Sequence, residues 1–209
     1  MKKINRLQYI TTTAELAEKA CSSGIGWIQL RLKNTTYETY KATALEVQAV
    51  CKAFNATFII NDNAALAAEV QADGVHLGKQ DMPVAAARKI LGDTSIIGAT
   101  ANTAADIAFL STQPVDYIGL GPFRFTTTKQ NLSPVLGLEG YQQIFTALAK
   151  SDIVYPPVIA IGGILPGDLE TLMQTGIHGV AVSGVITDSK DTGATVRSLQ
   201  KHVTVEIYD

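Results

Sequence analysis

The feature that most constrains this sequence is a short apolar run that returns eight times, each time separated from the next by a segment with helical spacing. The runs are LQYIT (7–11), WIQLRLK (27–33), TFIIND (57–62), GVHLG (74–78), SIIGATA (95–101), VDYIGLGP (115–122), PPVIAIGG (156–163) and GVAVSG (179–184). Alternation of strand and helix implies parallel strands, because the chain must cross back before each new strand begins. Eight such units predict an α/β fold: one (β/α)8 TIM barrel domain over residues 1–209.

A doubly wound open sheet is the alternative to a barrel. Its dinucleotide-binding form places Gly-x-Gly-x-x-Gly after the first strand, where this chain has TTTAEL. We therefore favour the barrel, which sets the active site at the carboxyl ends of the strands.

Composition excludes several classes of function. A net charge of -2 and a pI of about 5.9 argue against a broad nucleic-acid surface. No run approaches the ~18 apolar residues that would cross a membrane. The two cysteines, Cys21 and Cys51, lack metal-ligand spacing and are expected to be buried free thiols. These features favour a cytoplasmic enzyme with small-molecule partners, and a homo-oligomer is compatible with them.

The second run places cations where an active site would lie. In WIQLRLK, alternation sets Gln29, Arg31 and Lys33 on the inner face, opposite the leucines that meet the helices. Two cations there repel each other unless an anion neutralises them. The sequence favours a bound anion over the alternative, a structural salt bridge with carboxylates of the barrel.

Two acidic residues follow the next two strands. Asp62 stands where the third strand ends, and Asp81 follows the fourth. Asp62 alone could instead cap a helix that begins near Ala64. Two carboxylates at adjacent strand ends, beside cations, suggest a Mg²⁺ site for a diphosphate, because Mg²⁺ is held by one or two carboxylates plus waters and substrate phosphates.

Further polar side chains follow the fourth to sixth strands. His76 alternates to the inner face, where it is either structural or a substrate contact. Thr100 ends the fifth strand, where its hydroxyl could bind phosphate or simply fill the barrel. The loop GPFRFTTTKQN (121–131) sets Thr126 and Thr128 on one side, with Lys129 next to them. Hydroxyls beside an ammonium suit a phosphate.

The last two strands end in small residues. Gly163 and the Val182-Ser183 pair stand where barrels commonly hold a phosphate through backbone N–H groups. This site lies opposite the cations and acids of the second to fourth strands. Two anionic groups are therefore expected, as in a transferase or lyase that joins two phosphorylated small molecules.

Taken in order, these strand ends resemble the thiamine-phosphate synthase family. The matching segments are QLRLK (29–33), IND (60–62), ADGVHLGKQD (72–81), YIGLGP (117–122), TTTK (126–129), IGGI (161–164) and GVAVSGVI (179–186). The resemblance implies a (β/α)8 barrel that joins hydroxymethylpyrimidine diphosphate to a thiazole phosphate. It implies thiamine phosphate and diphosphate as products, formed through a carbocation.

The resemblance also implies a role for each matching position. Residues expected to hold the diphosphate are Arg31, Lys33, Asn61, Thr100 and Lys129, with Arg31, Lys33 and Lys129 as catalytic cations. The expected Mg²⁺ ligands are Asp62 and Asp81, and the residues near the pyrimidine are Gln29 and His76. The thiazole phosphate is expected on Thr126, Thr128 and the backbone around Gly163, Val182 and Ser183.

The chain is expected to depart from the family pattern in several places: a short N-terminus, a loop after the first strand reduced to Thr-Thr-Thr (11–13), and two further loops. Phe123-Arg124-Phe125 replaces an apolar stretch that often contains proline. Arg124 could add positive charge to the site or face solvent, and we favour solvent slightly. The fourth-strand loop reads Gly-Lys-Gln-Asp rather than Gly-Gln-Glu-Asp. The alternatives are a thiazole tautomerase on the same barrel, which needs no metal pair, and a non-catalytic phosphate-binding or regulatory protein. A Schiff-base aldolase is disfavoured because no lysine stands midway along a strand.

Overall fold

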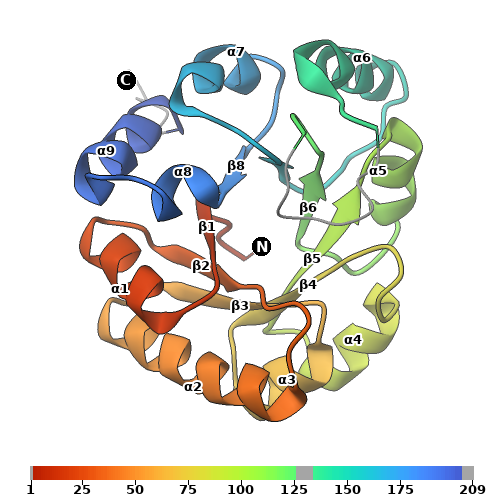
Figure 1. Ribbon diagram of the computed structural model, residues 1–209. Coiled ribbons are helices and arrows are strands. Elements are labelled where there is room, and N and C mark those ends of the chain that lie inside the picture. The colour runs from red at the N-terminus through yellow and green to blue at the C-terminus, as the bar shows by residue number, and fades with distance from the viewer. Residues whose placement is uncertain (1, 126–133, 204–209) are drawn as a thin grey trace.

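The computed structural model describes residues 2–125 and 134–203 as a closed ring of parallel strands inside a ring of helices (Figure 1). Residues 1, 126–133 and 204–209 lie outside the described part. The strands are β1 (Leu7–Thr11), β2 (Trp27–Leu30), β3 (Thr57–Asn61), β4 (Gly74–Leu77), β5 (Ile96–Ala101), β6 (Tyr117–Leu120), β7 (Val158–Ile161) and β8 (Gly179–Val182). Each pairs with the next, and β8 pairs with β1. The predicted (β/α)8 barrel is confirmed.

The helices cover the outside of this ring. They are α1 (Ala14–Ser22), α2 (Tyr37–Ala53), α3 (Ala64–Glu69), α4 (Val84–Leu91), α5 (Ala104–Leu110), α6 (Gly137–Ala149), the 3-10 turn η1 (Pro166–Asp168), α7 (Leu169–Met173), α8 (Gly184–Thr187) and α9 (Thr192–Val203). Thr13, Thr36, Asn63 and Thr103 accept a backbone hydrogen bond at the helix starts. Such caps satisfy N–H groups that have no partner within the helix. None of these helices is long and apolar enough to cross a membrane.

Most strands are shorter than the apolar runs that predicted them. Strand β2 ends at Leu30, although Arg31 N–H still donates to the Thr11 carbonyl at 3.0 Å. Asn34 then turns the chain with φ of 54°. Strand β6 ends before Gly121-Pro122, because proline has no N–H to continue a ladder. The lost residues become the loops that carry the predicted site.

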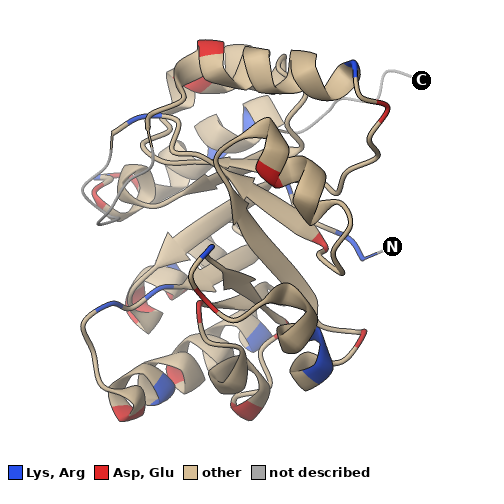
Figure 2. Cartoon of the chain, turned by 90° about the vertical axis from the view of Figure 1, so that its right-hand side faces the viewer, with Lys and Arg blue, Asp and Glu red and all other residues tan. Residues whose placement is uncertain are grey.

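Two apolar clusters hold the barrel together. The larger one lies between strands and helices and includes the buried free thiols of Cys21 and Cys51. The smaller one fills the barrel interior with Ile4, Ile10, Trp27, Ile59, Tyr117, Ile159 and Ala181. The strands carry no Lys, Arg, Asp or Glu, so the coloured charges in Figure 2 lie on helices and loops. Charge is therefore confined to the ends and the outside of the barrel.

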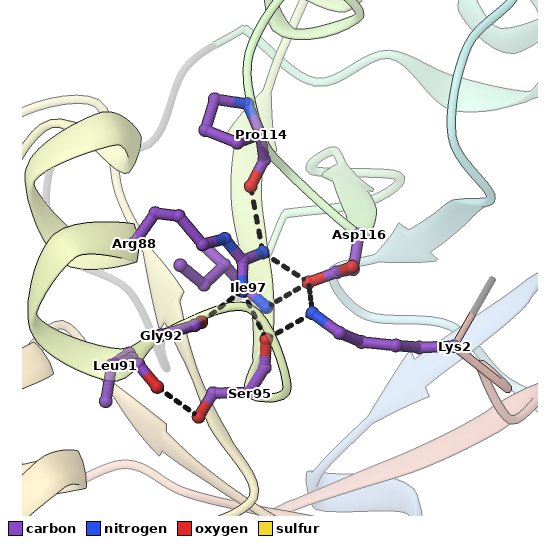
Figure 3. A network of polar contacts seen from close by, with 8 residues as sticks. All are labelled: Lys2, Arg88, Leu91, Gly92, Ser95, Ile97, Pro114 and Asp116. Atoms are coloured by element: carbon purple, nitrogen blue, oxygen red, sulfur yellow. Dashed lines mark hydrogen bonds and ion pairs between the residues drawn. The ribbon is translucent and has the colours of Figure 1, made fainter.

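The amino ends of the strands are closed by a polar network around Asp116 (Figure 3). Its Oδ2 accepts hydrogen bonds from Lys2 Nζ at 2.9 Å, Arg88 Nη2 at 2.7 Å and Ile97 N at 2.8 Å. Arg88 also donates to the Ser95 carbonyl at 2.6 Å. We call Lys2, Arg88, Ser95 and Asp116 the lower network; it ties the N-terminal segment across the strands.

Candidate active site

Lys33, Asp62 and Asp81 meet at the carboxyl ends of β2, β3 and β4. The Lys33 ammonium forms an ion pair with the Asp62 carboxylate, which also hydrogen-bonds the Asp81 carboxyl group. Asp81 Oδ2 accepts a hydrogen bond from Gly78 N at 2.6 Å. The structure thus brings together a cation and the two acids predicted to hold a metal. We call these three side chains the acid pair and its lysine.

The two carboxyl groups titrate as one system. Burial, together with the neighbouring Asp62, raises the pKa of Asp81. Burial also acts to raise the pKa of Asp62, but the hydrogen bonds from Lys33 and Asp81 outweigh it and lower that pKa. Ionising both of two close carboxyl groups is unfavourable because the like charges repel, so without a bound metal cation the pair favours sharing one proton.

Asp62 does not cap the following helix. Asn63 is the cap of α3 and accepts from Leu66 N at 2.9 Å, so the helix-cap alternative for Asp62 is wrong. Asp62 instead has φ of 66°, and its N–H donates to the His76 carbonyl at 2.7 Å. A positive φ in a non-glycine residue is costly and is kept where the surroundings require it. The turn leaves the Asp62 carboxylate to Lys33 and Asp81.

The ligand set suits a hard cation. Within residues 2–125 and 134–203, no three His, Cys, Asp or Glu side chains gather as a metal-binding group. A structural zinc site usually takes four protein ligands. Two carboxylates with room for water and phosphate fit Mg²⁺ better.

The two predicted cations lie in the loop that follows β2. Leu32 packs against the outer core, Arg31 is half-buried, and Lys33 reaches Asp62. Helix α2 braces this edge through Tyr40, whose hydroxyl hydrogen-bonds the Leu30 and Asn61 carbonyls at 2.9 Å each. Tyr40 thus links the ends of β2 and β3 just before the charged residues.

A line of polar side chains crosses the barrel interior beneath the site. Gln29 Nε2 donates to Gln8 Oε1 at 2.9 Å. His76 Nδ1 lies 3.0 Å from the Tyr117 hydroxyl, and its Nε2 lies 3.1 Å from Thr100 Oγ1. The predicted pyrimidine-side residues Gln29 and His76 therefore lie on the inner face, as expected. Both nitrogens of His76 contact protein side chains.

Two glycines make room for this line. A Cβ on Gly98 would lie 2.1 Å from the Tyr117 ring, and one on Gly119 would lie 2.9 Å from the His76 ring. Either contact is closer than real Cβ atoms tolerate. The small residues of β5 and β6 are therefore required for Tyr117 and His76 to fill the barrel.

The opposite side of the mouth is formed by the ends of β7 and β8. Gly162 and Gly163 follow β7 with φ of 104° and 64°. Pairing of Ile161 with Ala181 sets this turn beside Val182 and Ser183. Ser183 Oγ donates to the Ile10 carbonyl at 2.8 Å, so its hydroxyl ties β8 to β1, while its backbone is the predicted phosphate contact.

The β6 loop is described only up to Phe125. Thr126, Thr128 and Lys129 lie outside the described residues, and their predicted roles stay predictions. Arg124 is exposed, as expected, but it also forms an ion pair with Asp168 and hydrogen-bonds the Gly163 carbonyl. The sequence therefore predicted the exposure of Arg124 but not its contacts with Asp168 and Gly163.

Sequence reasoning missed three buried tyrosines that support the site. Tyr117 contacts His76, Tyr40 binds two strand-end carbonyls, and the Tyr141 hydroxyl of α6 donates to the Leu120 carbonyl. A signal was present, because Tyr40 and Tyr141 stand early in helices on the core-facing side. A hydroxyl on that side must find a partner, and strand-end carbonyls are the nearest acceptors.

Comparison with known proteins identifies the family. A protein named thiamine-phosphate synthase from Phocaeicola vulgatus is 47% identical over 203 residues, covering 94% of this chain and 97% of that protein. One of the same name from Flavobacterium johnsoniae is also 47% identical, covering 94% and 95%. A solved thiamine phosphate pyrophosphorylase from Pyrococcus furiosus has a TM-score of 0.81 at 28% identity, covering 95% of each chain.

A family model confirms the resemblance found in the strand ends. The model described as thiamine monophosphate synthase matches residues 4–186, which include every strand of the barrel and the helices from α1 to α7. The matched region contains the acid pair and its lysine, the inner polar line and the Gly162–Gly163 turn. This chain therefore belongs to the thiamine monophosphate synthase family.

Proposed function

We propose that this chain is a transferase that joins 4-amino-2-methyl-5-hydroxymethylpyrimidine diphosphate to a thiazole phosphate, giving thiamine phosphate and diphosphate. Membership of the family supports this reaction, and the predicted synthase activity is confirmed at that level. The observation in the molecule that carries the proposal is the acid pair and its lysine. An enzyme that binds one phosphate and no metal would have no use for two carboxylates held this close.

The proposed mechanism is a dissociative displacement. The bond between the pyrimidine methylene carbon and the diphosphate oxygen breaks, and its electron pair leaves with the diphosphate. The cation that remains is delocalised into the aminopyrimidine ring. The thiazole nitrogen then donates its lone pair to the methylene carbon, so no protein nucleophile is needed.

Positive charge held by the protein assists the leaving group. Arg31 and Lys33 follow β2, and Lys129 is predicted to complete this set from the β6 loop. Unit charges ~4 Å apart interact by ~1 kcal/mol in bulk water but by ~4 kcal/mol at an effective dielectric of 20. Cations fixed beside the diphosphate in a site that excludes water would therefore stabilise its departure.

A magnesium ion is proposed as the cofactor. Asp62 and Asp81 would hold it, and when bound it would neutralise charge on the diphosphate. Binding also removes a conflict, because a divalent cation allows both carboxylates to stay ionised. The raised pKa of Asp81 supports this assignment.

The inner polar line is proposed to orient Thr100 toward the diphosphate. Burial raises the pKa of Tyr117, so its hydroxyl stays protonated and can donate to His76 Nδ1. His76 would then carry its proton on Nε2 and donate to Thr100 Oγ1. The Thr100 hydroxyl would be left to donate to a phosphate oxygen. His76 and Gln29 remain proposed neighbours of the pyrimidine, and Asn61 of the diphosphate.

The thiazole phosphate is proposed to bind on the opposite side of the mouth. Its contacts would be the backbone around Gly163, Val182 and Ser183 together with Thr126 and Thr128. The two substrates would then approach from opposite sides of the barrel axis. Alignment of two bound partners is itself a large part of catalysis in such a reaction.

One assay tests the proposal directly. The protein is incubated with both phosphorylated substrates and Mg²⁺, and thiamine phosphate and diphosphate are measured together. Equal amounts of the two products are expected, with none when either substrate or Mg²⁺ is withheld. Binding of the substrates without any product would refute the transferase. The cytoplasmic location and the small-molecule partners remain predictions.

A further inference from the structure

The proposed function gives no role to the segment Phe123-Arg124-Phe125. In the structure it runs beside the end of β7. Phe123 N–H donates to the Ile161 carbonyl at 2.8 Å, and Arg124 N–H donates to the Gly162 carbonyl at 2.9 Å. The β6 and β7 chains therefore stay hydrogen-bonded beyond their strands.

The Arg124 side chain adds a further link to this pair of chains. Its Nη1 donates to the Gly163 carbonyl at 2.5 Å and to Asp168 Oδ2 at 2.9 Å, and its Nη2 donates to Asp168 Oδ1 at 2.9 Å. The guanidinium carbon lies 5.2 Å from the centre of the Phe123 ring. Phe123 is itself buried against Tyr141. We call the Arg124 contacts with Gly163 and Asp168 the rim clasp.

Arg124 fixes two peptide planes, one through its backbone N–H and one through the rim clasp. The carbonyls of Gly162 and Gly163 both face Arg124. In a planar trans peptide the N–H points opposite to the carbonyl, so the N–H groups of Gly163 and Ile164 point away from Arg124. Neither donates to any residue in the described part of the chain. Two N–H groups in a row are thus left to bind something else.

The approach of the two chains depends on glycine. A Cβ on Gly162 would lie 2.8 Å from Pro122 Cβ, and one on Gly163 would lie 3.1 Å from Arg124 Cβ. Both glycines also have positive φ, which side chains disfavour. The turn is therefore built around the segment that contains Arg124.

We propose that Arg124 is a positioning residue for the incoming monophosphate. It holds the Gly162–Gly163 turn so that the N–H groups of Gly163 and Ile164 face the phosphate of the thiazole substrate. Arg124 acts through the turn and does not touch the substrate. The inference rests on the proposed function, because it deepens the predicted monophosphate site.

Substitution of Asp168 separates positioning from direct attraction. If Arg124 bound the phosphate directly, Asp168→Asn would remove a nearby negative charge and tighten binding. If Arg124 positions the turn, the same change weakens its anchor and loosens binding. The two roles therefore predict opposite signs for one isosteric variant.

The kinetic test compares the two substrates in the full chain. Arg124→Met is expected to raise KM for the thiazole phosphate roughly tenfold, the scale of one lost hydrogen bond to an anion, and to leave KM for the pyrimidine diphosphate unchanged. Arg124→Lys keeps the charge but not the fork, and an intermediate KM is expected. Equal changes in both KM values, or a lower thiazole-phosphate KM in Asp168→Asn, would overturn the proposal.

Arg88→Met is the matched control. Arg88 also binds backbone carbonyls and an aspartate, but in the lower network at the other end of the barrel. It should lower stability without changing either KM below the unfolding temperature. A tenfold rise in the thiazole-phosphate KM in this variant would assign the Arg124 effect to general loss of stability and overturn the proposal.

A second readout needs no turnover. Inorganic phosphate is titrated into ¹⁵N-labelled protein while the amide signals of Gly163 and Ile164 are followed. Both should shift in the unaltered chain, and Arg124→Met should weaken the phosphate affinity roughly tenfold. Unshifted signals, or equal affinity in the variant, would refute positioning. If no thiamine phosphate forms in the synthase assay but these shifts appear, the proposed reaction fails and the phosphate site stands.

Discussion

The two ends of the barrel differ in how well their carboxyl groups are neutralised. At the amino ends, one carboxylate, Asp116, is surrounded by Lys2, Arg88 and a backbone N–H (Figure 3). At the carboxyl ends, Asp62 and Asp81 contact each other with Lys33 beside them, and the pKa of Asp81 is raised. The lower network is electrostatically complete, whereas the acid pair is not.

This difference separates stability from function. A complete network favours a single arrangement and needs no ligand. In an incomplete network such as the acid pair, two carboxyl groups repel each other until a cation binds between them. The repulsion lowers the stability of the protein and raises its affinity for the cation. Substitutions at the two ends should therefore have different consequences.

The largest effect is expected from Asp81→Asn. Asparagine keeps an oxygen for the Gly78 N–H but removes one proposed magnesium ligand. We expect kcat to fall by roughly 10²–10³-fold, since metal ions contribute several kcal/mol to such reactions. Stability should not fall, because the close contact between two carboxyl groups is lost. Turnover is measured against Mg²⁺ concentration, and unfolding is followed in urea.

Two results would contradict this view of the acid pair. Undiminished turnover in Asp81→Asn would remove Asp81 from the metal site. A large loss of stability would mean that the acid pair is structural, like the lower network. Adding a chelator to the unaltered protein should reproduce the loss of turnover without unfolding it.

Arg88→Met tests the other end. Side chains of Arg88 and Asp116 are 13% and 18% exposed, so the pair is mostly but not fully buried. We expect the free energy of unfolding to fall by about 2–3 kcal/mol, below the ~3–5 kcal/mol typical of breaking a fully buried pair. Activity per folded molecule should stay the same. If Arg88→Met were as stable as the unaltered chain but had a lower kcat, the assignment of stability to the amino ends and activity to the carboxyl ends would be wrong.

The sequence predicted the carboxyl-end site better than the lower network. The strand period placed Lys33, Asp62 and Asp81 at neighbouring strand ends, and parallel strands then brought them together. The lower network joins Lys2 to Asp116 across 114 positions of the chain. No local pattern indicates such a contact, because it depends on how the N-terminal segment crosses the barrel.

Loop contacts were the other part that sequence patterns could not supply. Arg124 was expected to face solvent, since no periodicity links it to Asp168, 44 positions later. The choice of helix cap also escaped prediction, because Asp62 and Asn63 are equally good cap residues and backbone geometry decides between them. The repeat of strand and helix fixes where loops lie but not which loop side chains bind each other.

Tyr117→Phe is expected to have a smaller effect on turnover than Asp81→Asn. It removes the hydroxyl beside His76 Nδ1, so His76 would lose its preference for a proton on Nε2. We expect kcat to fall roughly tenfold, about the worth of one misdirected hydrogen bond. Nitrogen-15 NMR of the chain's three histidines can read the His76 tautomer directly. If His76 carried its proton on Nδ1 in the unaltered protein, the proposed hydrogen bonds from Tyr117 to His76 and from His76 to Thr100 would be contradicted.

The smallest effect on stability is expected at the rim clasp. Like the lower network it pairs an arginine with an aspartate, but it lies at the carboxyl ends of the strands. Burial acts to raise the pKa of Asp168, but hydrogen bonds from Arg124 and Leu165 N–H outweigh it and lower that pKa. A carboxyl group whose pKa is lower in the folded state adds stability above its unfolded value of about 3.9 and loses it as pH falls.

The stability difference between the unaltered chain and Arg124→Met should therefore be complete above about pH 4 and shrink in stronger acid. The pH-dependent part of this difference, which comes from the Arg124–Asp168 pair, should stay below about 1 kcal/mol, because the Arg124 side chain is 45% exposed. Urea unfolding at a series of pH values measures it, and a difference that is constant into strong acid would exclude Asp168 as its source. The acid series thus separates what the clasp adds to stability from what it adds to substrate binding.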